Sequence, residues 1–385
     1  MPVRLHHSED LLVVQKNKQR IGYLDWLRGF ACLGMFEVHC YDAWLGGSAR
    51  QSSLFGLSQS SGTIPAPLFI LLSGISCALF SDQMRRRGAS ESDIAIRIVR
   101  RGAEIFGLGL LFRVQEYLLG LPGAPRTDLL RVDVLNLIGF SLLFIGVFLR
   151  FSLSHTARAI LASAIALGIA CVTPPLWTTW RPHWLPWFLE SYVNGVHNYD
   201  SPQPWLFPIF PWAGFAFAGL SVGFVLTSDW STKKPAKTTA LLAAVGLGLF
   251  FLAQLLDRIP RRLYSLYDYW HTSPNFFLAR VGICLVIVWI GYVWCRWGFG
   301  AVGFSPLVQL GQASLLVYWV HIEFVYGRFS ILSKTSEGAW ISTLGLLIVT
   351  AAMVLLAVAR SRWEKRGPHI VARLRALAGL EEAQG

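Results

Sequence analysis

The stretch LDWLRGFACLGMFEVHCYDAW, residues 24–44, has the length and apolar character of a membrane-spanning helix, yet it is interrupted by charge. Its ionisable residues are Asp25 and Arg28 near the start, and Glu37, His39 and Asp42 near the end. Such side chains are costly when they face lipid, so inside a membrane they face one another or a water-filled cavity. The stretch therefore predicts a helix that lines a polar site.

The composition extends this interpretation to the whole chain. Of the 385 residues, 54% are hydrophobic and 15% are charged, which is unusual for a soluble globular protein. Apolar runs long enough to cross a bilayer as a helix recur along the sequence. The predicted spans are 23–44, 64–82, 104–121, 133–150, 155–174, 205–227, 237–257, 275–296, 304–325 and 338–359. We predict an all-α polytopic membrane protein with about ten transmembrane helices in one bundle.

The charge distribution predicts the orientation. Lys and Arg number 34, and they concentrate in alternate connections, as in cytoplasmic loops. We expect a cytoplasmic segment 1–22, a transmembrane domain 23–359 and a cytoplasmic basic amphipathic tail 360–385. Basic and apolar residues within 83–103 predict a short helix on the membrane surface. Topology accounts for the basic runs, so no nucleic-acid partner is expected. No apolar stretch precedes the first span, so no cleavable signal peptide is expected either.

Several other predicted spans carry polar residues toward the extracytoplasmic side of the bundle. They are Arg113, Glu116, Asp133, Asn136, Arg280, His321 and Glu323. Convergence of so many polar groups favours a functional site. A buried ion pair that fixes helix packing, such as Arg113 with Glu116 one turn along, would explain single residues instead.

His39 and His321 are the candidates for acid–base chemistry, because imidazole titrates near neutrality. A neighbouring carboxylate, from Glu37, Asp42 or Glu323, could orient the ring. The His and carboxylate spacings match no zinc signature, so no metal is expected. The six cysteines show no paired C-x-x-C spacing and are interpreted as small packing residues.

Segments in a consistent order resemble a known family. They are R-x-x-x-LDWLRG at 20–29, APLFILLSGIS, RRGAEIFGLGLLFR, RVDVLNLIG, FPIFPWAGFAFAGLSVG, SPNFFLARVGI and LGQASLLVYWVHI. Together they resemble the heparan-α-glucosaminide N-acetyltransferase catalytic family, which is related to the acyltransferase-3 enzymes. The resemblance extends from about residue 20 to residue 326, and the order of the segments makes it specific.

The resemblance implies transfer of an acetyl group from cytoplasmic acetyl-CoA to a sugar or glycan amine or hydroxyl on the other side of the membrane. Phosphates of the coenzyme would suit the basic groups of the cytoplasmic side. The implied coenzyme-binding residues are Asp25, Arg28, Arg97, Arg100 and Arg101. The implied partners are acetyl-CoA, a glycan acceptor and the lipid bilayer, in a bacterial inner membrane, with a homodimer left open.

The chain departs from the family pattern at one point. Close relatives have a histidine in an H-x-x-W-N-G-like pattern before the second span, whereas residues 44–67 here contain none. The nearest histidine is His39, where acyltransferase-3 enzymes also place one. We therefore predict that His39 is the general base, with Glu37 or Asp42 holding its ring and His321 as the alternative. Groups that could position the acceptor or stabilise an oxyanion are Arg113, Glu116, Asp133, Asn136 and Arg280.

Two other functions fit the same residues. A proton-coupled transporter of a small polar or sugar-like solute could relay protons through the carboxylates and histidines, although no matched second half is visible in the sequence. A non-catalytic lipid or glycan binder is the other alternative. Binding of acetyl-CoA would separate the enzyme from the transporter.

Overall fold

The computed structural model describes residues 22–195, 207–260, 263–266, 268–298 and 304–377, with side chains up to residue 363. This part of the chain is helical, with no β-strand and one isolated bridge between Leu45 and Glu337. The predicted all-α class is confirmed. The predicted N-terminal segment, apart from Gly22, and the last residues of the predicted tail lie outside the described residues.

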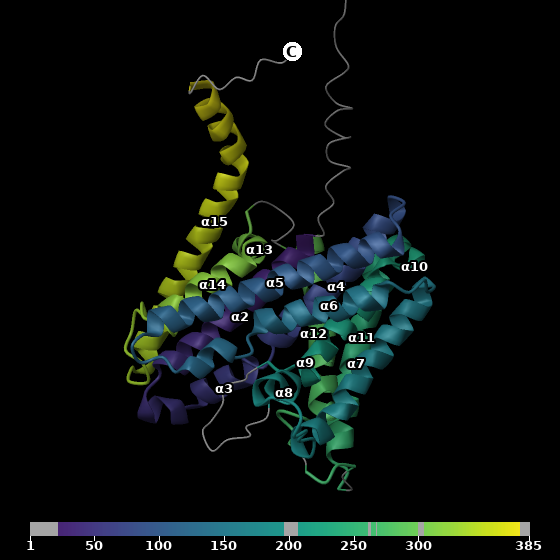
Figure 1. Cartoon of the computed structure of the whole chain (residues 1–385), viewed down its shortest axis with the longest axis horizontal. Coiled ribbons are helices and arrows are strands. Elements are labelled where there is room, and N and C mark those ends of the chain that lie inside the picture. The colour runs from purple at the N-terminus through teal and green to yellow at the C-terminus, as the bar shows by residue number, and fades with distance from the viewer. Residues whose placement is uncertain (1–21, 196–206, 261–262, 267, 299–303, 378–385) are drawn as a thin grey trace, which may run out of the picture.

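Each predicted span contains helix. The helices are α2 (Gly22–Trp44), α3 (Ser53–Ser61), α4 (Pro65–Arg86), α5 (Glu91–Gly120), α6 (Val134–Leu149), α7 (His155–Thr178), α8 (Trp187–Asn194), α9 (Ile209–Thr227), α10 (Asp229–Lys233), α11 (Pro235–Asp257), α12 (Pro274–Trp297), α13 (Pro306–Gln312), α14 (Ser314–Val325) and α15 (Ala339–Leu377), with short 3₁₀ turns η1 (Gly47–Gln51) and η2 (Arg126–Leu130). Figure 1 shows them as a tilted bundle from which the end of α15 projects.

Seven helical segments of the described chain are long and apolar enough to cross a membrane, which supports an integral membrane protein. The predicted number of about ten is not confirmed. Two predicted spans correspond to α2 and α5, which are long but rich in charged residues. A third, 304–325, is divided at Ala313 into the shorter helices α13 and α14.

The separate surface helix predicted within 83–103 is not present. Ser90 caps a helix that runs unbroken from Glu91 to Gly120, and the Ser90 hydroxyl accepts a hydrogen bond from the Asp93 backbone. Ile94 and Ile98 are buried. The amphipathic pattern therefore reflects packing inside the bundle. The basic segment is the first part of α5.

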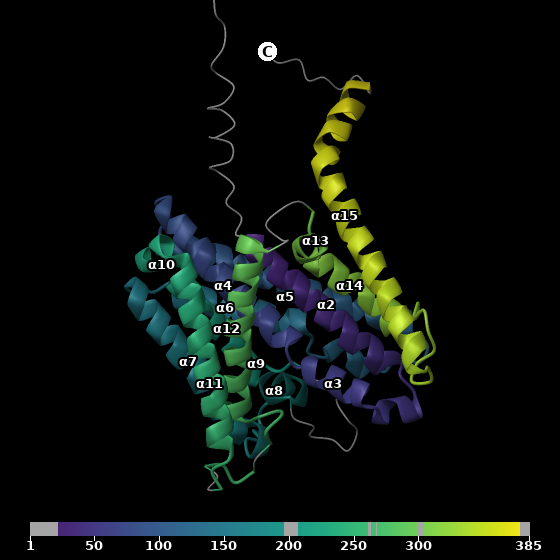
Figure 2. The same cartoon turned by 180° about the vertical axis from the view of Figure 1, so that it is seen from behind.

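The helices drawn in Figures 1 and 2 enclose two hydrophobic cores. One core lies among α2, α13, α14 and α15 and contains Phe36 and Trp44. The other lies among α4, α5, α6, α7, α9 and α12, and contains Leu71 and Phe215. α2 contributes to both cores, so it lies where the two groups of helices meet.

α2 and α13 approach at backbone distance. A Cβ atom on Gly29 would overlap the Leu307 carbonyl, and one on Gly311 would overlap the Asp25 carbonyl. Small residues permit this approach between membrane helices. The two glycines fix how α2 lies against its neighbour, and therefore where its polar side chains point.

A polar layer joins α4, α5 and α7 at one end of the bundle. Arg85 donates two hydrogen bonds of 2.8 Å to the Glu91 carboxylate. The buried Arg158 donates a third, of 2.6 Å, to the same carboxylate. One carboxylate thus connects two arginines from different helices.

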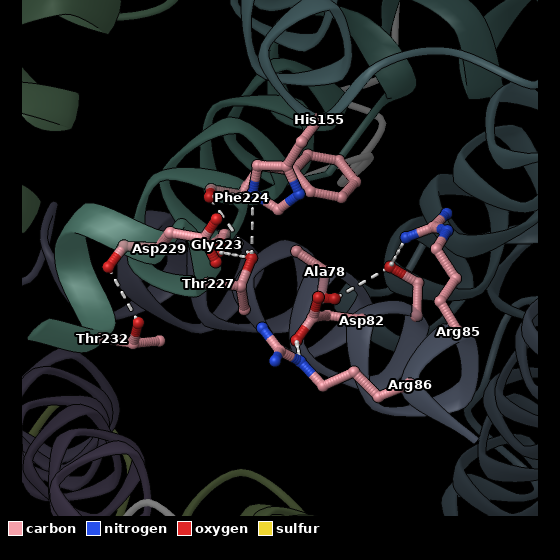
Figure 3. A network of polar contacts seen from close by, with 11 residues as sticks. Ala78, Asp82, Arg85, Arg86, His155, Gly223, Phe224, Thr227, Asp229 and Thr232 are labelled. Carbon is pink, nitrogen blue, oxygen red and sulfur yellow. Dashed lines mark hydrogen bonds and ion pairs between the residues drawn. The ribbon is translucent and has the colours of Figure 1, made fainter. Parts of the chain in front are cut away.

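Figure 3 shows the contacts beside this layer. Arg86 pairs with Asp82 one turn earlier at 2.8 Å. The His155 Nε2 atom lies 2.6 Å from the Phe224 carbonyl oxygen, and because a carbonyl only accepts, Nε2 is the donor. This bond ties the start of α7 to α9.

We expect Glu91→Gln to destabilise the protein in a pH-dependent way. Arg85 and then Arg158 hold the pKa of Glu91 below its usual range. A carboxyl whose pKa is lowered by folding stabilises the folded protein at pH values above its unfolded pKa of about 4. This stabilisation is lost as the pH falls through the pKa of the folded protein. The cost at pH 7 should be about 1 kcal/mol, because solvent screens the partly exposed group.

Thermal unfolding in detergent tests this expectation. The difference between variant and wild type should shrink between pH 7 and pH values below 4. A difference that is the same at both ends of this range would contradict it.

Candidate functional site

A cavity of about 1070 Å³ lies between the two groups of helices. Side chains of α2, α4, α5, α6 and α14 form its wall. Both Arg28 and His39 line it, and they are eleven residues apart on α2, which corresponds to about 16 Å. We call its two ends the Arg28 end and the His39 end.

Arginines surround the Arg28 end. Arg28, Arg97 and Arg101 line the cavity. Arg97 and Arg101 precede Arg113, which lies toward the His39 end, by 16 and 12 residues on α5, so they lie toward the Arg28 end. Arg28 donates hydrogen bonds to the Asp25 carboxylate at 2.8 Å and to the Ser76 hydroxyl at 2.6 Å. Asp25 is buried behind the wall and does not line the cavity, so it positions the Arg28 guanidinium.

The predicted coenzyme-binding cluster is only partly brought together. Arg100 is not a lining residue; its side chain is 82% exposed and lies 3.4 Å from Glu104. Arg101 also contacts Glu104, at 3.2 Å, yet reaches the cavity. Helical geometry separates adjacent side chains by about 100°, so neighbouring residues of this run cannot all face one cavity.

At the His39 end two histidines are hydrogen-bonded. His39 Nδ1 lies 2.9 Å from His321 Nε2, and His321 Nδ1 lies 3.0 Å from the Val317 carbonyl oxygen. Because the carbonyl only accepts, His321 carries its proton on Nδ1 and accepts at Nε2. His39 therefore donates from Nδ1, and its Nε2 is left as a bare acceptor.

His39 lines the cavity, whereas His321 is fully buried behind it. The Nε2 atom of His39 makes no hydrogen bond to any described residue. Tyr326 packs edge-on against the His39 ring, with centroids 5.3 Å apart. The ring is held by its Nδ1 atom, and its other nitrogen has no partner among the described residues.

The predicted ring-orienting carboxylates have other partners. Glu37 accepts from the Ser61 hydroxyl at 3.3 Å. Asp42 accepts from the Tyr326 hydroxyl at 2.9 Å and lies 3.8 Å from Arg50. In the described structure the hydrogen-bond partner of His39 is instead His321, the residue predicted as the alternative base.

A buried ion pair crosses the cavity wall. Arg113 of α5 lies 3.2 Å from Asp133 at the start of α6, and both side chains are buried. The Tyr318 hydroxyl of α14 contacts the same carboxylate at 2.8 and 3.0 Å. The sequence had suggested Glu116 as a partner for Arg113, but the partner comes from another helix.

Glu116 lines the cavity, and the Glu323 carboxyl of α14 lies close to it. Glu323 accepts from Gln115 Nε2 at 2.6 Å, and Trp319 donates to the Gln115 oxygen at 2.8 Å, which fixes the amide. Each carboxyl leaves one buried oxygen without a partner in the described residues. Carboxyl groups from α5 and α14 thus meet beside the cavity.

Two predicted residues lie away from the cavity. Asn136 is fully buried in the capping box of α6 with Asp133, and donates to the Phe106 carbonyl at 3.3 Å. Arg280 belongs to α12 and stacks over the Phe276 ring at 4.6 Å. Neither is a lining residue of the described cavity.

Three lining residues were missed in the sequence: Arg131, Tyr318 and Tyr326. Arg131 begins the segment RVDVLNLIG but stands before the predicted span 133–150, where the apolar pattern indicates a connection. Tyr318 precedes His321 by three residues, a spacing that puts both on one side of a helix. That spacing is the signal that could have found it.

The family model described as heparan-alpha-glucosaminide N-acetyltransferase, catalytic, matches residues 20–255. The chain belongs to this family. The match includes His39, Arg113 and Asp133 and ends before α12, so the helix that carries His321 lies beyond it. No curated protein matches the chain. The family is one of membrane acetyltransferases, which agrees with the predicted enzyme class.

We expect Asp133→Asn to destabilise the protein by about 3–5 kcal/mol, because it leaves the buried Arg113 charge without its counter-ion. Tyr318→Phe removes one hydrogen bond to the same carboxylate and should cost about 1 kcal/mol. Thermal unfolding in detergent compares the two variants. Equal shifts of the unfolding midpoint would contradict a structural role for the ion pair.

Proposed function

We propose that the protein transfers an acetyl group from acetyl-CoA to a sugar or glycan amine or hydroxyl. The observation that carries this proposal is a single cavity with three arginines at one end and a bare imidazole nitrogen at the other. Family membership supports the reaction class. The arrangement suits a donor and an acceptor that enter from different sides.

The Arg28 end suits the phosphates of the donor. Guanidinium groups bind phosphate oxygens through paired, charge-assisted hydrogen bonds. Arg28, Arg97 and Arg101 are the residues that would make them, with Asp25 holding Arg28 in place. The middle of the cavity is lined by apolar side chains such as Phe69 and Leu142, along which an extended donor could pass toward His39.

In this proposal His39 acts as general base. Its Nε2 atom removes the proton from the acceptor as the acceptor nitrogen or oxygen bonds to the thioester carbon. The C–S bond then breaks, and the imidazolium returns the proton to the departing thiolate. His321 accepts from His39 Nδ1 throughout and keeps the required tautomer.

Arg113 is the group best placed to stabilise the developing oxyanion. It lines the cavity, and its Nε atom is buried without a partner among the described residues. Preorganised donors of this kind are effective because they need no reorganisation during the reaction. An acetyl group carried briefly on His39 Nε2 is an alternative route with the same residues.

The orientation follows from the same scheme. Acetyl-CoA is supplied in the cytoplasm, so the Arg28 end should face the cytoplasm and both termini should lie there. The distribution of Lys and Arg supports this orientation. We propose a bacterial inner membrane as the location.

His39→Ala should lower kcat for acetyl transfer by about 10²–10⁴-fold, the usual contribution of a general base. Binding of labelled acetyl-CoA to the purified protein should be unchanged, because His39 lies at the far end of the cavity. Absence of acetyl-CoA binding in the wild type would favour the transporter. Retained activity in the variant would move the role of the base to His321.

His321 can be tested as a positioning residue. His321→Leu removes the acceptor for His39 Nδ1 and should lower kcat by about 100-fold, with an unchanged KM for acetyl-CoA. His321→Gln keeps an acceptor oxygen and should recover much of the loss. If both variants lose activity equally, the hydrogen bond does not orient His39.

A further inference from the structure

Arg131 is a cation of the cavity wall that makes no ion pair with a described residue. It lines the His39 end of the cavity, half-buried, just before α6. Its side chain makes no hydrogen bond or ion pair to any described residue. A guanidinium carries five N–H donors, and leaving them unused in a partly buried place is unfavourable.

The nearby carboxylates are already engaged. Asp133 pairs with Arg113 and accepts from Tyr318, and Asp42 accepts from Tyr326. Asp42 also lies near Arg50, and Glu116 faces Glu323. None of these groups forms an ion pair with Arg131, and neither does Asp128 of the same connection, although Asp128 and Asp133 both act on its charge through space.

Arg113 adds a second unused donor on the same side. Its Nη2 atom contacts Asp133, but its Nε atom is buried and has no partner within the described residues. Arg113 is buried, with 6% of the residue's surface exposed. Both guanidiniums therefore lie near Asp133, which pairs with Arg113 alone, and N–H donors of both are left without a partner in the described residues.

These donors are separate from those at the Arg28 end. Arg113 follows Arg101 by twelve residues on α5, which corresponds to about 18 Å along the helix. A donor whose phosphates occupy the Arg28 end would thus leave Arg131 to the second substrate. Guanidinium forks match the geometry of carboxylate and phosphate groups.

We propose that Arg131, beside Arg113, forms an anion-binding subsite at the His39 end, and that the acceptor carries a carboxylate or phosphate close to the atom that is acetylated. The role of the acceptor rests on the proposed function. The binding of an anionic sugar does not, because it can be measured without any transfer.

The test uses the full-length protein in detergent with three probe sugars: glucose, glucose 6-phosphate and glucuronate. Their affinities are measured from the shift of the thermal unfolding midpoint, with saturating coenzyme A present. The wild type should bind at least one of the anionic sugars about 10- to 100-fold more tightly than glucose, as expected for hydrogen bonds to a charged group. A preference for one of them identifies the acidic group as phosphate or carboxylate.

Variants assign the preference to the subsite. Arg131→Gln should abolish it, and Arg131→Lys should keep part of it, because the charge remains but the fork is lost. Arg126→Gln is the matched control, since Arg126 is exposed in the same connection and does not line the cavity. If Arg131→Gln does not fold, Arg131→Lys is compared with the wild type and with Arg126→Gln instead.

The proposal is overturned if the wild type binds glucose as tightly as both anionic sugars, or if Arg126→Gln has the same effect as Arg131→Gln. It is also overturned if Arg131→Gln weakens coenzyme A binding and leaves the sugars unaffected, since Arg131 would then serve the donor. If coenzyme A does not bind, the proposed function is contradicted. The comparison of the three sugars would still test the anion-binding subsite.

Discussion

The Asp133 carboxylate is the point at which three helices of this membrane protein are held around a cavity. It accepts from Tyr318 of α14, pairs with Arg113 of α5 and caps α6 through the Leu135 backbone. Inside a bilayer such a charge is tolerated only with partners that satisfy it. Asp133, Arg113 and Tyr318 thus link helices α5 and α6 of one hydrophobic core to helix α14 of the other.

The same principle organises the chemistry. A backbone carbonyl at Val317 sets the tautomer of His321, and His321 in turn sets that of His39. Each hydrogen bond in this chain needs one donor and one acceptor. The Val317 carbonyl, which contacts His321, therefore also determines that His39 Nε2 carries no proton. At the Arg28 end of the cavity, hydrogen bonds to Asp25 and Ser76 likewise fix the position of the Arg28 guanidinium.

Several predictions could be made because they depend on local pattern. Apolar runs located the helices, and charged residues within apolar helices located His39, Arg113 and Asp133, all of which line the cavity. Contacts between residues far apart in the sequence did not follow from local pattern. Glu37 and Asp42 have other hydrogen bonds, Arg100 faces outward, and Asn136 is used as a cap. Arg280 lies on a helix whose packing turns it elsewhere.

The sequence by itself determined the class of the protein, the helical segments and the family, because length, hydropathy and ordered motifs are properties of the chain alone. Only the tertiary structure decided which charges meet. The His39–His321 contact joins residues far apart in the sequence, and it arises from the close approach of α2 to the α13–α14 pair at Gly29 and Gly311. Periodicity assigns a side chain to a face of its helix, but the rotation and tilt of the helix come from packing against its neighbours.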